Sequence, residues 1–457
     1  MATEVGSLKW VFNTKKNLDG SVQKRKARLV ANGFDGESVS RFETVRMYLA
    51  LSAHLNWPIY QLDVQSGTLE GDLHEDIYTS QPEGFVAQGM ENRVCKLNKA
   101  VYGLKQAPLV WFTKLHSFFL QNGFQRTRND PSLYTKKDCA NRLLLLVCVF
   151  VDDVIYMGSS PSVVAEFKQS MMRVFRMEDL GLLHSLLGLE IKQGEGGVFV
   201  SQIKAAHHLL NQFNMINCKA VTTPMSFDEN LQVDDGSDSI ADGNSFTSLV
   251  EGLITLTRTR PDIAYAVGVV ARSKHDPIQP FEAAKRILRY IAGTRDMGIW
   301  YSSYDEFDLV GFTGAGPFGD KRSSSGFVFN FGSGAVAWGS RERGPGIVSK
   351  SEAEYVGAAR SACQAMWLRS VLADLGHQRK EATRIFCDNV DMTKNTLLHG
   401  RTEHIDMKLD FVRELVAAES ISFKSCDTRE QQADILTKVV SPDRHAGFRI
   451  RLGVRSY

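Results

Sequence analysis

The amino-acid sequence predicts an α+β fold in a chain of several domains. Runs rich in β-branched and aromatic residues, which are typical of strands, occur in both halves of the chain at 143–156 and 325–331. The segment 98–124 carries an apolar stripe at helical spacing, as expected for a helix that packs on a core. The stripe consists of Trp111, Leu115, Phe118 and Phe119. At 457 residues the chain is long enough for about two to four such domains.

Composition and charge are those of an ordinary globular protein. Hydrophobic residues make up 43% of the chain and the formal net charge is only +2, so local patches must attract any nucleic acid. The seven cysteines contain no C-x-x-C pair, which argues against a zinc or disulfide framework and for a reducing compartment. No signal peptide is visible, and the longest apolar run, 143–151, is too short for a membrane helix. We therefore expect a soluble intracellular protein with no membrane partner.

Two adjacent aspartates stand in the most apolar run of the chain. Nine apolar residues lead into Asp152 and Asp153, and the strand-like segment 154–156 follows. The pair is therefore expected at a tight turn between two buried strands. Adjacent carboxylates repel each other, and desolvating them is costly unless a positive charge offsets the penalty. An exposed Asp-Asp turn and a cation-binding site are both compatible with this pattern.

A third acid lies in a similar setting upstream. Residues 44–56 are predicted to form a helix, and the alternating strand 59–64 then carries Asp63 near its end. An acid at the tip of a buried strand either caps the next helix or binds a metal ion.

A basic hairpin is expected near the start of the chain. Residues 9–34 alternate like two strands around a turn at 17–20, with seven Lys or Arg residues against the single acid Asp19. Such a hairpin can bind the phosphates of a template or of a nucleotide, and a solvated charged hairpin is the alternative.

The rest of the chain alternates between helical and extended patterns. The acidic segment 226–245 contains no base and is expected to be an exposed linker and domain boundary. Helical or mixed segments are expected at 161–192, 200–216, 246–301, 352–375 and 404–418, and extended segments at 198–201, 308–312, 325–331, 335–338 and 384–387.

Several motifs, taken in order, resemble the Pol polyprotein of copia-type LTR retrotransposons. Phe-Val-Asp-Asp at 150–153 is similar to the Tyr-x-Asp-Asp box of reverse transcriptases. Further similar motifs lie at 9–12, 26–31, 62–64, 81–85, 101–108, 180–191, 260–265, 351–355, 401–406 and 433–438. Because these motifs follow the family order over nearly the whole chain, the chain resembles the reverse transcriptase and RNase H region of that polyprotein.

The resemblance implies a right-hand polymerase with fingers and an antiparallel palm sheet flanked by helices, then a helical connection and an RNase H-like α/β domain. The expected domains are fingers and palm with thumb-like helices at 1–225 (palm at about 59–160), the linker at 226–245, the connection at 246–301, the RNase H-like domain at 302–445 and a tail at 446–457. We expect the chain to begin at the fingers hairpin, without protease, integrase or the first polymerase helix. A connection after Phe34 is expected to be shortened by about ten residues, which such connections tolerate.

The resemblance also implies a polymerase site. Asp63, Asp152 and Asp153 are expected to be its catalytic acids and to bind two Mg²⁺ ions, with Mn²⁺ as an alternative. The Val64 carbonyl is expected as a further metal ligand. One ion would activate the primer 3′-hydroxyl, and the other would hold the triphosphate and the leaving pyrophosphate.

Four residues are expected in the nucleotide site by the same resemblance. They are Lys26, Arg28, Gln106 and Thr68. Thr68 stands where the family usually has an aromatic residue that excludes a 2′-hydroxyl, so the discrimination between sugars is in question. The expected partners are an RNA template with a DNA primer, or an RNA/DNA hybrid, and deoxynucleoside triphosphates.

The C-terminal part resembles RNase H but departs from it at one position. Glu352, Asp388 and Asp434 match three of the family's metal-binding acids. The first acid of the family should follow Thr313, but Gly314 stands there. Because glycine offers no side-chain ligand, we expect little or no RNase H activity.

The predicted function is that of an RNA-directed DNA polymerase of a partly degenerate retrotransposon, acting by two-metal nucleotidyl transfer. A catalytically dead remnant that at most binds nucleic acid through its basic hairpin is the alternative. A two-metal nucleotidyl enzyme of another family is a third interpretation, which the C-terminal motifs disfavour. The expected location is the cytoplasm, with a virus-like particle or the nucleus as alternatives. The sequence leaves catalytic activity and oligomeric state open.

Overall fold

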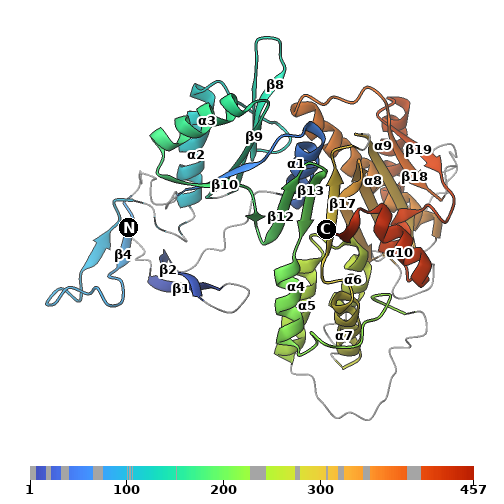
Figure 1. Ribbon diagram of the computed structural model, residues 1–457, viewed down its shortest axis with the longest axis horizontal. Coiled ribbons are helices and arrows are strands. Elements are labelled where there is room, and N and C mark those ends of the chain that lie inside the picture. Colours follow the sequence, from blue (N-terminus) through green and yellow to red (C-terminus); the bar gives the residue numbers. More distant parts are fainter. Residues whose placement is uncertain are drawn as a thin grey trace. The chain divides into compact units, whose positions relative to one another are not determined.

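A computed structural model shows the arrangement of the helices and strands (Figure 1). It describes residues 7–16, 22–31, 41–64, 76–99, 101, 104, 106–150, 152–226, 243–272, 278–304, 307–316, 324–342, 350–388 and 403–457. The chain divides into two compact units. Unit 1 contains Met1–Arg41 and Pro58–Leu183, and unit 2 contains Phe42–Trp57 and His184–Tyr457.

Unit 1 is built on a six-stranded antiparallel sheet in the order β10-β3-β9-β8-β7-β6. The strands are β3 (Tyr60–Val64), β6 (Gln125–Arg126), β7 (Leu133–Lys137), β8 (Leu143–Phe150), β9 (Asp153–Gly158) and β10 (Met177–Leu182). Two further antiparallel pairs are β1 (Leu8–Lys16) with β2 (Val22–Ala31), and β4 (Tyr78–Ser80) with β5 (Val94–Lys96).

Two helices complete the core of unit 1. They are α2 (Gln106–Gln121) and α3 (Pro161–Val174). The apolar stripe of α2, including Trp111 and Phe119, packs with Tyr156 of β9 and Phe167 of α3. Helix α3 begins sharply because the Ser160 hydroxyl accepts a hydrogen bond from the backbone of its first turn and a proline follows at once.

Unit 2 contains two five-stranded sheets. The first has the order β11-β12-β13-β14-β20 and is antiparallel throughout. Its strands are β11 (Ser185–Leu186), β12 (Leu189–Gly194), β13 (Gly197–Ser201), β14 (Met297–Ser302) and β20 (Val454–Ser456). The second has the order β17-β16-β15-β18-β19 and is mixed, because β18 and β19 run parallel to β15. Its strands are β15 (Leu309–Ala315), β16 (Ser324–Phe331), β17 (Gly334–Glu342), β18 (Thr383–Cys387) and β19 (Ile421–Ser425).

Helices of unit 2 form one layer of their own and also cover the mixed sheet. The layer consists of α4 (Ile203–Gln212), α5 (Gly243–Leu256), the 3₁₀ helix η2 (Pro261–Ile263), α6 (Ala264–Arg272) and α7 (Ile278–Ala292), which share one apolar core. The others are α8 (Lys350–Asp374), α9 (Glu403–Ala417), the 3₁₀ helix η4 (Gln432–Leu436) and α10 (Pro442–Arg451). Both α8 and η4 pack on β15 and β16.

Helix α1 (Phe42–Leu55) belongs to unit 2, although its neighbours in sequence on both sides belong to unit 1. Every residue from 44 to 53 is buried. A helix without a polar face is stable only inside a core. It packs on β13 and β14 of the first sheet and on β17 of the second (Figure 1).

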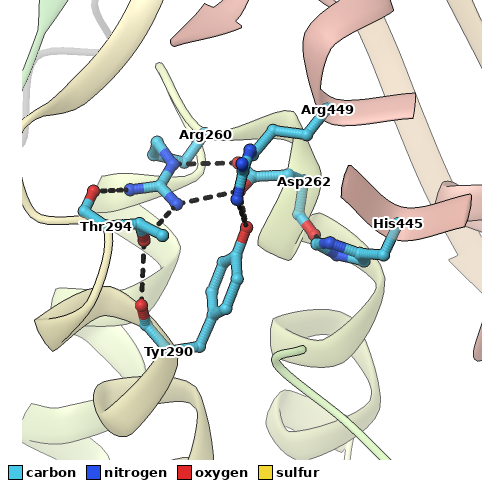
Figure 2. Close-up of polar contacts among 6 residues, drawn as sticks. All are labelled: Arg260, Asp262, Tyr290, Thr294, His445 and Arg449. Carbon is cyan, nitrogen blue, oxygen red and sulfur yellow. Dashed lines mark hydrogen bonds and ion pairs between the residues drawn. The ribbon is translucent and has the colours of Figure 1, made fainter. Parts of the chain in front are cut away.

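A buried cluster of charged side chains joins the helical layer to the C-terminal helix of unit 2 (Figure 2). Arg260 donates two hydrogen bonds to the Asp262 carboxylate, at 2.9 and 2.8 Å, and one to the Thr294 carbonyl at 2.8 Å. The Tyr290 hydroxyl donates to the same carboxylate at 2.7 Å. Burial alone would raise the pKa of Asp262, but Arg260 outweighs it and holds this pKa below the usual range. The ion pair is therefore tolerated inside the core because its polar groups are bonded.

Helix α10 contributes two residues to this cluster (Figure 2). The His445 ring lies edge-on to Tyr290, and its Nε2 is 3.1 Å from the Asp262 carbonyl oxygen. Arg449 donates to the Tyr290 hydroxyl at 3.4 Å. These contacts fix α10, which the sequence did not predict as an element, against η2 and α7.

The mixed α and β composition expected from the sequence is confirmed. Two local expectations are corrected. The end of segment 246–301, expected to be helical, forms β14 because β13 and β20 offer it two partners. The expected tail at 446–457 completes α10 and forms β20, with Leu452 and Val454 fully buried.

Other expectations on domain organisation stay predictions. The two units divide between Leu183 and His184, and most of the expected acidic linker at 226–245 lies outside the described residues. Within the described part of the chain, no helix is both long enough and apolar enough to cross a membrane.

We predict that His445 makes unit 2 sensitive to acid. Burial lowers the pKa of His445 below its ordinary value, with Asp262 acting against this shift and Arg449 and Arg260 reinforcing it. The unfolded chain therefore binds more protons below about pH 6.5, so stability that is present above this pH is lost as the pH falls through it.

Between pH 7.5 and 5.5 the free energy of unfolding should fall less in His445→Gln than in the wild-type chain. The difference should be up to about 1.4 kcal/mol per pH unit. Urea unfolding at the two pH values measures this difference. His208→Gln, at an exposed position of α4, is the control and should keep the wild-type slope. An unchanged slope in His445→Gln would contradict the prediction.

Candidate active site

The pairing of β3 with β9 brings together acids that are about ninety positions apart in the sequence. In this antiparallel register Asp63 lies directly opposite Asp153. The Val64 backbone N–H donates to the Asp152 carbonyl at 2.9 Å. This bond makes 63 and 153 a non-hydrogen-bonded pair, in which Cα atoms are about 4.5 Å apart and side chains are closest. The three aspartates therefore share one end of the sheet.

The alternation of strand side chains decides which face carries the acids. Leu62, Val64 and Val154 point into the core of unit 1. Because neighbours along a strand face opposite sides, Asp63 lies on the other face together with Gln61. Gln61 donates from Nε2 to Asp153 Oδ1 at 2.7 Å. Gln61 was not predicted as a site residue, although its spacing of two residues from Asp63 places both on the same face.

The chemistry of these donors suits a hard divalent cation, since carboxylate oxygens are the ligands that Mg²⁺ prefers. Asp63, Asp152 and Asp153 are all partly buried, and Oδ1 of Asp152 is fully shielded from solvent. Within the described residues, however, no group of three or more His, Cys, Asp or Glu side chains is arranged to hold a metal ion. The strands thus bring the acids close together without a complete ligand set, and the carboxylates would have to turn toward a bound ion.

The residues expected in the nucleotide site are only partly visible. Lys26 and Arg28 lie in β2, and Gln106 is the first residue of α2, but their side chains lie outside the described part of the structure. Thr68 also lies outside it. The roles of these four residues stay predictions.

A second acidic group lies at the mixed sheet of unit 2. Gly314 is in β15, and the Gln431 side chain joins this strand to β18 by donating to the Thr313 carbonyl at 3.2 Å and to Asp388 Oδ1 at 3.3 Å. Glu352 lies in the first turn of α8, the helix that packs on β15. The fold therefore gathers the positions expected to match RNase H acids around one end of β15.

Asp434 is held by two bases of the chain itself. Its side chain is 1% exposed, and Lys438 Nζ and Arg444 Nη2 lie 2.9 and 2.7 Å from its two carboxylate oxygens. Burial raises the pKa of Asp434, and Lys438 and Arg444 partly offset this shift while Asp388 adds to it. Both oxygens that would serve a cation are therefore already bonded to protein cations, which the sequence analysis did not foresee.

Comparison with known proteins decides the family. Residues 3–227 match the family model described as reverse transcriptase (RNA-dependent DNA polymerase). The chain is 36% identical over 473 residues to the retrovirus-related Pol polyprotein from transposon TNT 1-94 of Nicotiana tabacum, covering 98% of this chain and 35% of that protein. It is 30% identical over 312 residues to the putative transposon Ty5-1 protein of Saccharomyces cerevisiae, covering 66% of this chain and 99% of that protein. The chain belongs to the retrotransposon Pol family.

This chain spans about a third of the length of the plant Pol polyproteins that it matches. Among solved structures, the foamy viral protease-reverse transcriptase in complex with dsDNA aligns with 94% of this chain and 77% of that chain, at 13% identity and a TM-score of 0.24. A likeness at this level carries no argument, so membership of the Pol family rests on the sequence relatives.

In this Pol chain, packing does not require a glycine at position 314. A Cβ added there would meet only the Ala433 Cβ, at 3.6 Å, which is an ordinary contact. Gly326, its partner across the β15–β16 pair, is different. A Cβ at 326 would lie 2.9 Å from side-chain atoms of both Leu436 and Thr437. There is therefore room for a Cβ at position 314, whereas position 326 has none.

We predict opposite effects for alanine at these two facing glycines. Gly314→Ala should leave the free energy of unfolding unchanged or raise it by up to about 1 kcal/mol, because the unfolded chain loses freedom. Gly326→Ala should lower it by about 1–3 kcal/mol, because η4 must move away. Chemical denaturation of both variants measures the difference, and equal losses in the two would show that Gly314 is also needed for packing.

Proposed function

We propose that this Pol chain is an RNA-directed DNA polymerase whose active site is the Asp63, Asp152 and Asp153 end of the unit 1 sheet. The observation that carries the proposal is the β3–β9 register, which sets Asp63 opposite Asp153 in a chain of the retrotransposon Pol family. In this proposal the antiparallel sheet is the palm, the β1–β2 hairpin belongs to the fingers, and the mixed sheet of unit 2 belongs to an RNase H-like domain.

The three aspartates, with the Val64 carbonyl, would hold two Mg²⁺ ions. When bound, such ions activate a primer 3′-hydroxyl and neutralise the charge that develops on the triphosphate. The chain supplies the positions of the ligands. The buried strands β8 and β9 fix the backbone of the aspartate pair, and Gln61 orients one oxygen of Asp153. Lys26, Arg28, Gln106 and Thr68 would line the nucleotide, with an RNA template, a DNA primer and deoxynucleoside triphosphates as substrates.

A catalytically dead remnant is the second candidate function. Gly314 offers no ligand and the oxygens of Asp434 are bonded to Lys438 and Arg444, which favours a chain that has lost its chemistry and only binds nucleic acid. Both candidates share the fold and the basic hairpin, so catalysis alone separates them.

Primer extension on an RNA template with Mg²⁺ tests the polymerase directly. The wild-type chain should incorporate nucleotides, and Asp152→Asn should lower the rate by more than about 100-fold. Removing a group that only supports a metal ligand costs at most about 100-fold, so a larger loss indicates that Asp152 is itself a ligand. Asp296→Asn, at an exposed position that follows α7, is the matched control and should retain the wild-type rate. Template binding without incorporation by the wild type would favour the remnant.

The RNase H-like part is proposed to be inactive. Gly314 offers no ligand, and the oxygens of Asp434 are bonded to Lys438 and Arg444. We therefore predict no cleavage of the RNA strand of an RNA/DNA hybrid. An assay with a labelled hybrid measures this, and turnover that disappears in Asp388→Asn would prove the prediction wrong.

A further inference from the structure

Two arginines of unit 2 lie beside one serine on the face of the mixed sheet that α8 covers. In the β16–β17 pair Arg341 stands directly opposite Ser325, so both side chains lie on the same face with Cβ atoms about 5 Å apart. This face carries α8, because a Cβ added at Gly357 of that helix would lie 3.9 Å from the Ser325 Cβ. Arg360, also of α8, donates from Nη1 to the Ser325 hydroxyl at 3.3 Å. Two guanidinium groups from different elements therefore lie around the same hydroxyl group.

The charge of this cluster is not balanced by an acid. Burial lowers the pKa of the Arg360 guanidinium, and the positive charge of Arg341 lowers it further. Between described residues, no ion pair joins either of these arginines to a carboxylate. Glu342, the next residue of β17, faces the other side of the sheet, where it lies 3.6 Å from Arg272. Two like charges close together, with no acid between them, favour the binding of an anion.

The cluster is open on one side and fixed on the other. Arg341 is exposed near the end of β17, whereas Arg360 is half-buried and Ser325 is buried. The buried hydroxyl holds the Arg360 guanidinium in place, and the exposed guanidinium of Arg341 can turn toward a ligand. The planar fork of an arginine matches the oxygens of a phosphate group, and a fork that is already held in place loses less entropy on binding.

We propose that Arg341, Arg360 and Ser325 form a phosphate-binding site in unit 2 whose occupant is a backbone phosphate of a nucleic acid strand. The choice of a nucleic acid over a free phosphate ion rests on the proposed function, whereas the binding of phosphate rests on the cluster alone. The site needs none of the acids at 352, 388 and 434. A C-terminal unit without nuclease activity would therefore still hold the strand.

The test measures the binding of a labelled RNA/DNA hybrid to the full chain over a range of salt concentrations. Arg341→Gln and Arg360→Gln should each weaken binding by about tenfold, because each removes charge-assisted hydrogen bonds to one phosphate. The double variant should lose little more than either single variant, since both arginines bind the same group. For the same reason the slope of log K against log salt, which counts the phosphates that are neutralised, should become shallower by about one unit in all three variants.

Stability separates this role from a structural one. Arg341→Gln removes the charge next to Arg360, so the free energy of unfolding should stay unchanged or rise. A lower free energy of unfolding, with unchanged binding, would show that Arg341 only supports the sheet. Arg295→Gln, at another exposed position of unit 2, is the matched control and should keep the wild-type affinity and slope.

Inorganic phosphate distinguishes the two sources of the ligand. If it raises the Tm of the wild-type chain at constant ionic strength while the double variant binds the hybrid as tightly as wild type, the site binds free phosphate and the proposed occupant is wrong. Unchanged affinity and slope in the double variant, or no binding of the hybrid by the wild type, would likewise overturn the inference. A wild-type chain that binds the hybrid through these arginines but extends no primer would contradict the polymerase proposal and leave this inference standing.

Discussion

The pairing of β3 with β9 is the interaction on which the account of this protein depends. The ladder from Tyr60 opposite Tyr156 to Asp63 opposite Asp153, extended by the hydrogen bond from the Val64 N–H to the Asp152 carbonyl, sets the two aspartates as facing neighbours. A slip of one residue would turn Asp63 into the apolar core and Leu62 to the other face. The apolar contacts of the buried side chains of β3, β8 and β9 stabilise this register and thereby hold the like-charged acids close together.

The protein treats buried charge in two ways. Arg260 with Asp262, and Asp434 with Lys438 and Arg444, are closed sets in which each carboxylate already has protein cations. Such sets stabilise the positions of helices but have no free oxygen to offer. At the end of β3 and β9, the contact described for Asp153 is the neutral amide of Gln61. The acids at the end of β3 and β9 are the candidates for chemistry because the strand register brings them together, whereas Asp434 in unit 2 is enclosed by Lys438 and Arg444.

Local patterns in the sequence predicted the elements around the acids because their causes are local. The apolar run before Asp152 and the polar residues that bound it define β8 and β9, and the alternation at 59–64 defines β3. The partners of α1 could not be predicted, since a helix that is buried on all sides does not reveal in its sequence which sheets bury it. Likewise β14 depends on strands distant in sequence. The pairing of Asp434 with Arg444 depends on where α10 docks, which periodicity does not record.

Disulfide trapping across β3 and β9 tests the central claim most directly. In the double variant Asp63→Cys with Asp153→Cys, mild oxidation should join the two cysteines quickly, because facing residues of a non-hydrogen-bonded pair bring their Cβ atoms within reach of a disulfide. Mapping of the linked peptides by mass spectrometry identifies the bond. Gln61→Cys with Asp153→Cys, two residues out of register, should link far more slowly. Equal linking in both variants, or none in the first, would contradict the register on which the proposed active site rests.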